Sequence, residues 1–353
     1  MAVCPSTRVG RVEVPAGAPR QDAHEILAKG AVECVVRSET DLEPLRDCLT
    51  TKIANAVLQS PGVIALGRGA APVATGSGPT EPVVAGPAEA ATPASVTPQP
   101  TAYALVVGIE LYRDAPAATG AHADAERFAA VLVHTLGLRN EHIRLAIGER
   151  ATKTDIESQL SWLKASVPAG GRLYFFFSGH GAPDAASGTP YLLPYDGNPA
   201  AVTDTALPLG EVMSRLSRAR AKEVLAFVDS CFSGAGGRSV LPPGARPLVR
   251  VKDEAPAAQL ALFTASGGTE ISGPAPGENV GLFTKLVTEG LGTGAADGDG
   301  NGEISLQELA DWVTPRVARA ARQASREQNP RLVLGHGMGS AANVSVAWGY
   351  PTR

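Results

Sequence analysis

A cysteine and a histidine each follow a short apolar run and stand among glycine and serine residues. Cys231 lies in FVDSCFSG, and His180 lies 51 residues earlier in FFFSGHG. A thiol is only slightly ionised at neutral pH, but a nearby imidazole can take its proton and later protonate a leaving amine. Either residue alone is more often structural, whereas the two motifs together predict a nucleophilic dyad that attacks a carbonyl group.

Asp229, two residues before the cysteine, indicates a second role for the same segment. Side chains alternate along a strand with period two, so those of Asp229 and Cys231 should point to the same side. A carboxylate is poorly suited to activating a thiolate, but it is well suited to binding a cation in an adjacent pocket. The sequence therefore indicates a pocket for a basic side chain beside the nucleophile.

The elements that must position these residues alternate between strands and helices from residue 102 onward. Such alternation predicts an α/β domain with a mainly parallel sheet covered by helices on both faces. Because chemistry gathers beyond the carboxyl ends of parallel strands, the two motifs should meet at one edge of the sheet. The expected strands are 103–109, 172–178, 224–228 and 259–266, and the expected helices are 124–136, 152–167, 209–216, 281–291 and 306–323.

The 353-residue chain divides into three parts by composition. Residues 1–68 are expected to form a small N-terminal module of unknown function, and residues 101–353 form the α/β domain that carries the motifs. Residues 69–100 consist almost entirely of Ala, Pro, Gly, Thr, Ser and Val. Because such a segment cannot bury enough apolar area to offset the entropy of ordering, we expect an extended linker there.

Charge, hydropathy and cysteine content limit which binding partners and which cellular compartment we expect. The net charge of −4 gives no global reason to expect nucleic acid or an anionic membrane as a partner. No apolar run approaches the ~20 residues that span a bilayer. The N-terminus lacks the apolar core of a signal peptide, which favours a cytoplasmic protein, or an exported one if the start is trimmed. Of the four cysteines, Cys4, Cys34, Cys48 and Cys231, none is expected in a disulfide, although a Cys34–Cys48 bridge is the alternative in an exported protein.

A separate motif, DGDGNGEISLQE at 297–308, has the pattern of a twelve-residue calcium loop. Calcium prefers six or seven oxygen ligands, one pair of which comes from a bidentate glutamate at the last position of the loop. The helix after the loop fits this pattern, whereas the helix before it is interrupted by GLGTGAA, and a purely structural acidic turn is the alternative. The ligands predicted for Ca²⁺ are Asp297, Asp299, Asn301, the carbonyl of Glu303, and Glu308.

The combined motifs resemble those of the caspase-like cysteine peptidases, specifically the metacaspase and bacterial orthocaspase branch. The resemblance extends from about Ala102 to Leu334 and includes YALVVGI, TGAHADAERF, PYD at 194–196, LFTAS and GLFTKLVTEGL. It implies a caspase-like fold and a cysteine endopeptidase that acts on protein or peptide substrates, with His180 as general base and Cys231 as nucleophile. It also implies that the N–H of Gly181 contributes to the oxyanion hole and that the protein is a monomer.

The resemblance also bears on which residue precedes the cleaved bond. In metacaspase-like enzymes, an acid of the first helix, the serine of SGHG and the acid before the cysteine form a pocket for a basic side chain. Caspases that cut after aspartate instead have an arginine where this chain has Ala118, and a Gln-Ala pair where this chain has Asp229 and Ser230. Metacaspases often have a histidine at the position of Phe232. We therefore expect cleavage after Arg or Lys, with Asp124, Ser178 and Asp229 in the pocket.

A segment rich in glycine and proline, 234–259, follows the cysteine and joins two expected strands. Exposed loops of this kind are where proteolysis concentrates, so an enzyme that prefers basic residues could process itself there; an uncut loop is the alternative. The candidate processing sites are Arg238, Arg246, Arg250 and Lys252. Two other functions remain open at this point: a catalytically silent scaffold that binds calcium or a partner, and a hydrolase or acyl transferase that acts on non-peptide substrates.

Overall fold

The computed structural model describes residues 96–232, 257–267, 270 and 272–352. The expectations for the module 1–68, for the first three cysteines and for linker residues 69–95 lie outside the described residues. The four candidate processing sites in the 234–259 loop also lie outside them. Linker residues near 100 contact the domain, because the side-chain amide of Gln99 donates to the carbonyl of Leu136 at 2.7 Å.

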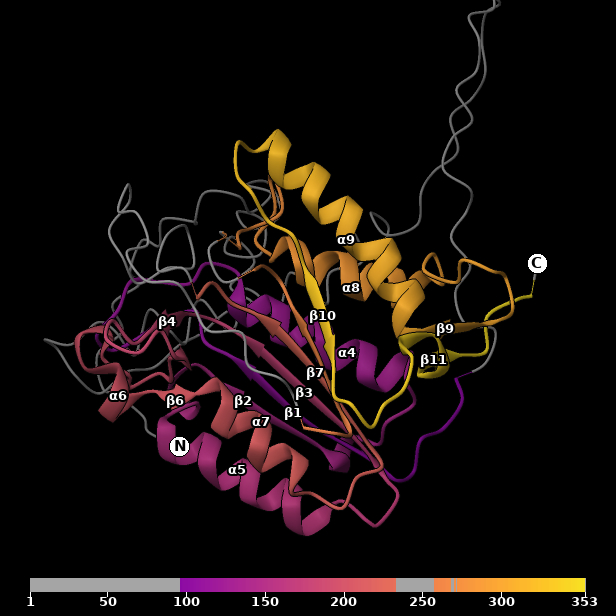
Figure 1. The fold of residues 1–353 in the computed structure, drawn as a ribbon, viewed down its shortest axis with the longest axis horizontal. Coiled ribbons are helices and arrows are strands. Elements are labelled where there is room, and N and C mark those ends of the chain that lie inside the picture. Colours follow the sequence, from indigo (N-terminus) through magenta and orange to yellow (C-terminus); the bar gives the residue numbers. More distant parts are fainter. Residues whose placement is uncertain (1–95, 233–256, 268–269, 271, 353) are drawn as a thin grey trace, which may run out of the picture. The chain divides into compact units, whose positions relative to one another are not determined.

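A six-stranded sheet with the order β10-β8-β7-β3-β1-β2 forms the centre of the domain (Figure 1). All neighbours along it are parallel except β10, which is antiparallel to β8. The prediction of a mainly parallel α/β sheet is therefore confirmed. The strands are β1 (Ala102–Gly108), β2 (Ile143–Ile147), β3 (Arg172–Ser178), β7 (Glu223–Asp229), β8 (Leu260–Thr264) and β10 (Arg331–Leu334).

Helices cover both faces of this sheet, as Figure 1 shows. Buried residues of α4, α8 and α9 form one apolar cluster with the sheet, and those of α5 and α7 form a second cluster on the opposite face. Among the described residues, no helix is long and apolar enough to cross a bilayer. The helices are α4 (Ala121–His134), α5 (Lys153–Ser166), α6 (Val202–Thr205), α7 (Leu209–Ser217), α8 (Leu282–Thr293) and α9 (Leu306–Gln323), with short 3₁₀ turns η1 (Asn140–His142), η2 (Gly148–Arg150), η3 (Pro199–Ala201) and η4 (Ala341–Asn343).

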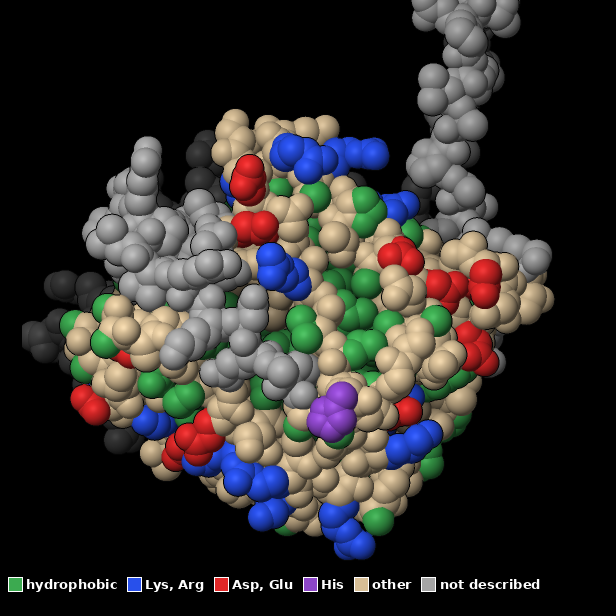
Figure 2. Space-filling model, viewed as in Figure 1, with side chains coloured by type: hydrophobic (Ala, Val, Ile, Leu, Met, Phe, Trp, Pro, Cys, Tyr) green, Lys and Arg blue, Asp and Glu red, His purple; other side chains and the backbone are tan. Residues whose placement is uncertain are grey.

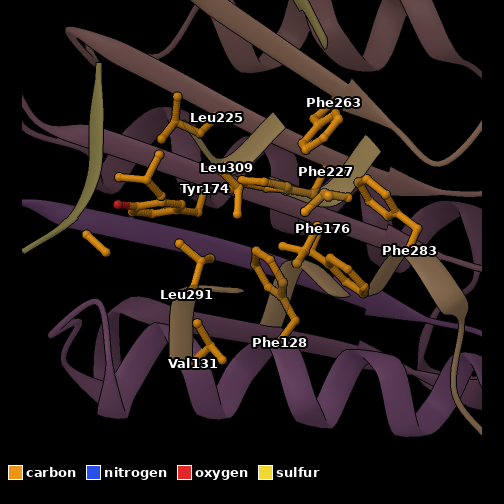
Figure 3. Packing of buried hydrophobic residues seen from close by; sticks show 14 of the residues in the cluster. Phe128, Val131, Tyr174, Phe176, Leu225, Phe227, Phe263, Phe283, Leu291 and Leu309 are labelled. Carbon is orange, nitrogen blue, oxygen red and sulfur yellow. The ribbon is translucent and has the colours of Figure 1, made fainter. Parts of the chain in front are cut away.

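The run of phenylalanines in β3 contributes to both clusters because consecutive side chains of a strand point to opposite faces. Phe176 packs on the α4 side, whereas Phe175 and Phe177 belong to the α5 side. Figure 3 shows Phe128 of α4 beside Phe176, and their rings stack with centroids 4.4 Å apart. This aromatic packing holds α4 against the strands that end in the two chemical motifs.

Two glycines determine where α4 lies, and α4 begins three residues earlier than expected. Gly120 precedes the helix with a left-handed φ of 85°, and a Cβ there would lie 3.0 Å from the backbone of Asn279. A Cβ at Gly108, the last residue of β1, would lie 2.4 Å from the Cβ of Ala125. Because both positions lack a side chain, α4 crosses directly over the end of β1 and brings its acid, Asp124, to the edge of the sheet.

Five short strands and both outer strands of the main sheet were not expected from the sequence. Short strands contain too few residues to show a period, and β2 and β10 are short edge strands that are partly exposed. One small sheet has the order β4-β5-β6, and β9 pairs with β11 in a second one. These strands are β4 (Gly181–Pro183), β5 (Pro190–Leu192), β6 (Leu207–Pro208), β9 (Glu303–Ser305) and β11 (Ser345–Trp348).

Candidate active site

The cysteine and histidine motifs follow adjacent parallel strands in matching register. Ser178, the last residue of β3, is paired with Asp229, the last residue of β7. His180 and Cys231 therefore each lie two residues beyond a paired position, and both are completely buried. A Cβ built on Gly181 would lie 2.8 Å from the carbonyl oxygen of Cys231, so the two turns are in direct contact. The structure thus brings together the residues that the sequence predicted to meet.

His180 is oriented by the loop that follows β1. Its Nε2 lies 2.7 Å from the carbonyl oxygen of Pro116. Because a carbonyl only accepts hydrogen bonds, Nε2 is the donor, and a neutral imidazole then carries its basic lone pair on Nδ1. The backbone N–H of His180 donates to the hydroxyl of Tyr112 at 2.7 Å, and the two rings lie 4.8 Å apart. Nδ1 is therefore the atom that can accept a proton from a thiol.

The two glycines of SGHG allow these close approaches. Gly179 has φ 158°, and a Cβ there would lie 2.4 Å from the hydroxyl oxygen of Tyr112. A Cβ at Gly181 would lie 2.6 Å from the hydroxyl oxygen of Ser230. Any larger residue at either position would separate the histidine turn from the elements it contacts, so glycine is required for packing as well as for backbone access.

The thiol of Cys231 is covered by Ser272. The backbone N–H of Ser272 donates to Sγ at 2.6 Å, and Sγ lies 3.1 Å from the carbonyl oxygen of the same residue. Ser272 is itself completely buried. The thiol of Cys231 is therefore in contact with the backbone of Ser272, which lies between β8 and α8.

The three residues predicted to form a pocket for a basic side chain, Asp124, Ser178 and Asp229, lie near the N-terminus of α8. The carboxylate of Asp124 accepts hydrogen bonds from the hydroxyl of Ser178 and from the N–H of Gly281, both at 2.7 Å. Asp229 accepts from the hydroxyl of Thr284 at 2.7 Å and from its N–H at 3.2 Å. Both acids are completely buried. The N-terminus of a helix carries a partial positive charge and four N–H groups without helical acceptors, which stabilises the two carboxylates there.

Ser272 also contacts one of these acids, because its hydroxyl donates to Oδ1 of Asp229 at 2.7 Å. The sequence did not reveal this residue, nor Tyr112, Pro116 and Thr284. Pro116 contributes a backbone carbonyl, and Ser272 contacts the thiol through its backbone, which no side-chain pattern can indicate. The hydroxyl of Tyr112 comes from a loop far from both motifs in the sequence. The hydroxyl of Thr284 lies in the first turn of a predicted helix, where an anchoring hydroxyl can be sought.

The acidic loop before α9 brings three of the five predicted calcium ligands together. Carboxylate oxygens of Asp297, Asp299 and Glu308 all lie within 4.8 Å of one another. On the face drawn in Figure 2, acidic side chains gather over this loop and β9. Asn301 donates its amide to Asp299 at 3.0 Å, whereas the side chain of Glu303 accepts from Ser345. The donor set is made of hard oxygens and fits a divalent cation such as Ca²⁺.

Glu308 also caps α9. Its Oε2 accepts from the N–H and hydroxyl of Ser305, while its Oε1 accepts from the N–H groups of Gly298 and Asp299. Burial on its own raises the pKa of Glu308, but these hydrogen bonds outweigh it and the pKa is lowered. The carboxylate is therefore the preferred form at neutral pH, as a cation ligand must be.

The helix before the acidic loop is longer than the sequence predicted. The entering helix α8 continues through the glycines of GLGTG to Thr293 and ends at Gly294, which has a left-handed φ of 70°. The loop strand β9 pairs with β11 near the C-terminal end of the domain. The loop is thus bordered by a helix on each side and supported by a second strand.

A parallel sheet whose adjacent strands end in a histidine turn and a cysteine turn, with helices on both faces, defines a caspase-type cysteine peptidase domain. Residues 101–336 match the family model of the caspase domain, Peptidase C14. The chain belongs to this family, and the expected caspase-like fold is confirmed.

Solved structures with a similar fold include protein GSU0716 from Geobacter sulfurreducens. It has a TM-score of 0.47 and 18% sequence identity, over 66% of this chain and 94% of that chain. Caspase-1 from Spodoptera frugiperda has a TM-score of 0.46 and 15% identity, over 72% of this chain and 92% of that chain. No curated protein matches the chain.

Proposed function

We propose that the protein is a cysteine endopeptidase that uses His180 and Cys231 and cleaves peptide bonds after Arg or Lys. The observation that carries this proposal is the pairing of Ser178 with Asp229, which sets both motifs side by side at one edge of a caspase-family sheet. A catalytically silent scaffold would not require an imidazole whose Nε2 is engaged by a carbonyl and whose Nδ1 is the basic atom.

The proposed reaction follows from this geometry. Nδ1 of His180 takes the proton of the Cys231 thiol, and the thiolate attacks the scissile carbonyl carbon. The N–H of Gly181 stabilises the resulting oxyanion. When the tetrahedral intermediate collapses, the C–N bond breaks, the imidazolium protonates the leaving amine, and an acyl-enzyme remains. A water molecule that loses its proton to His180 then hydrolyses the thioester and restores the thiol.

The acid at the end of β7 supports the choice of a basic side chain. Asp229 is completely buried beside the nucleophile, and its carboxylate is held by donors from α8. A buried carboxylate is stabilised by an ion pair with a cation and repels an anionic side chain. In this proposal Asp124 and Ser178, which are bonded to each other, complete the acidic wall of the pocket.

Calcium binding is part of the same proposal. Asp297, Asp299 and Glu308 would hold the ion together with the side-chain oxygen of Asn301 and the carbonyl of Glu303. The ion would neutralise three clustered carboxylates and so stabilise the junction between α8 and α9. Self-processing at Arg238, Arg246, Arg250 or Lys252 and a monomeric state also remain predictions from the sequence.

The proposal is tested with fluorogenic peptides that end in Arg, Lys or Asp before the reporter group, with and without calcium. We expect cleavage of the Arg and Lys peptides by the wild type and none by Cys231→Ala. If no condition gives cleavage that depends on Cys231, the endopeptidase assignment is wrong and the scaffold function is favoured. Preference for the Asp peptide would overturn the pocket and leave the dyad intact.

A further inference from the structure

One residue, Ser272, occupies the two positions that a substrate of this site would need. Its backbone N–H and carbonyl oxygen contact Sγ of Cys231 at 2.6 and 3.1 Å. Its hydroxyl donates to Oδ1 of Asp229 at 2.7 Å. All three residues are completely buried.

The space over the thiol is the space where the scissile carbonyl must lie. For attack, the carbonyl carbon has to come within roughly 3–3.5 Å of the nucleophile. The backbone nitrogen and carbonyl oxygen of Ser272 already lie within this distance of Sγ, at 2.6 and 3.1 Å. A substrate therefore cannot reach the reactive position until Ser272 moves away.

The hydrogen bond from Ser272 to Asp229 also occupies a position that a substrate would need. Oδ2 of Asp229 is anchored by the N–H and hydroxyl of Thr284, whereas Oδ1 accepts the hydroxyl of Ser272. An Arg or Lys side chain can replace that hydroxyl with a stronger, charge-assisted hydrogen bond. The Ser272 hydroxyl thus stands where the cationic group of a substrate would bind.

Anchors on both sides hold Ser272 in this place. The carboxylate of Glu270 accepts from the N–H and side-chain amide of Asn329 at 2.7 and 2.8 Å. On the other side, the carbonyl of Gly273 accepts from the N–H of Leu282 at 3.0 Å, and the carbonyl of Pro274 accepts from Arg326 at 2.8 Å. Described residues on both sides of Ser272 are therefore held by hydrogen bonds to other parts of the domain.

We propose that Ser272 is an internal competitor of the substrate, which a basic side chain displaces from Asp229 before Cys231 can react. This inference rests on the proposed function for its account of the basic substrate. The contact makes the enzyme latent: it weakens substrate binding without taking part in the chemical steps. Loss of the hydroxyl should lower KM for Arg and Lys peptides and leave kcat unchanged, because only the step before attack becomes easier.

The first test measures how fast iodoacetamide alkylates Cys231, with the modified peptide quantified by mass spectrometry in the full chain. Because the hydroxyl of Ser272 is hydrogen-bonded to a charged group, Ser272→Ala should raise this rate by roughly tenfold or more. The control is Ser266→Ala, which removes another buried serine hydroxyl from the same connection between β8 and α8 and should keep the wild-type rate. Equal rates in Ser272→Ala and the wild type would overturn the proposal.

A second test needs no change in Ser272. Methylguanidine, a small cation with the end group of arginine, should accelerate alkylation of Cys231 in the wild type by displacing the hydroxyl. It should have no effect in Asp229→Asn, and failure to accelerate alkylation in the wild type would also contradict the proposal.

Peptide kinetics separate this inference from the proposed function. Faster alkylation without cleavage of any peptide would refute the endopeptidase and leave the competitor role standing. Cleavage with an unchanged KM in Ser272→Ala would refute the competitor role and leave the endopeptidase standing.

Discussion

Ser178 and Asp229 are paired across β3 and β7 as the last residues of their strands. This register gives the two motifs equal spacing from the edge of the sheet, so the histidine and the cysteine follow at equivalent positions. The hydroxyl of Ser178 also donates to the carboxylate of Asp124 in α4 at 2.7 Å. The proposed dyad and the acids of the proposed pocket therefore lie at the ends of the same pair of strands, β3 and β7, and on the neighbouring helix α4.

Replacement of either member of the dyad should remove activity without unfolding the protein. Cys231→Ala and His180→Ala remove the nucleophile and the base, and each should lower kcat by roughly 10³-fold or more, as in other coupled catalytic groups. Peptide hydrolysis and thermal unfolding of the same preparations provide the measurement. Residual activity near the wild-type level in either variant would exclude the dyad mechanism.

Tyr112→Phe should impair catalysis through the position of His180. The variant keeps the ring against the imidazole but removes the acceptor of the buried His180 N–H, and an unsatisfied buried donor costs about 1–3 kcal/mol. We expect kcat to fall by about tenfold with little change in KM. Tyr195→Phe, whose hydroxyl lies near Glu149 instead, is the matched control. An unchanged kcat in Tyr112→Phe would show that the imidazole is oriented by Pro116 alone.

The sequence predicted those parts of the fold whose signal is carried by side chains. The continuous apolar run of β3 and the amphipathic pattern of α9 gave the observed bounds, 172–178 and 306–323, because both elements bury a long face. The edge strands β2 and β10 were missed because part of each faces solvent. Their place in the sheet depends on pairing with distant strands, which a local pattern does not encode.

In the candidate site, too, roles carried by side chains could be predicted from the sequence, whereas roles carried by the backbone could not. His180, Cys231, Asp124 and Asp229 could be predicted as site residues because their side-chain chemistry is visible in the sequence. Pro116 contributes only a carbonyl, and Ser272 contacts the thiol through its backbone, so nothing in the type of either residue marks these roles. Such contacts follow from how loops close over the sheet, and only the structure reveals them.

Gly179→Ala should destabilise the domain. A methyl group at this position would lie 2.4 Å from the hydroxyl of Tyr112 on a backbone with φ 158°, and such strained substitutions cost about 1–3 kcal/mol. Urea unfolding monitored by circular dichroism gives the free energy of unfolding. Gly292→Ala is the control, since nothing lies within 4 Å of its Cβ position in α8, and it should stabilise the domain by roughly 0.4–1 kcal/mol. Equal stability of Gly179→Ala and the wild type would contradict the packing described for SGHG.

Asp229→Asn should abolish the preference for basic residues. The amide keeps the shape of the side chain but removes the charge, and loss of one partner of a buried ion pair costs about 3–5 kcal/mol. We expect kcat/KM for Arg and Lys peptides to fall by at least about a hundredfold, which follows from that energy at 1.4 kcal/mol per tenfold change. Asp114→Asn, in the loop after β1 where the acid is half exposed, should leave the preference unchanged. A retained preference for Arg in Asp229→Asn would assign the pocket to Asp124 instead.

Calcium should raise the unfolding temperature through Glu308. An ion that binds only the folded state at a hundredfold excess over its Kd adds about 2.7 kcal/mol, which corresponds to roughly 5–10 °C for a domain of this size. Glu308→Gln keeps a side chain able to cap α9 but removes one of the three clustered carboxylates, so the shift between EDTA and calcium should disappear. Asp311→Asn removes a charge from the same helix, where the acid bonds only to Gln307 among the contacts described, and should keep the shift. A wild-type protein whose unfolding temperature is the same in EDTA and in calcium would mean that the loop is a structural turn held by its own hydrogen bonds.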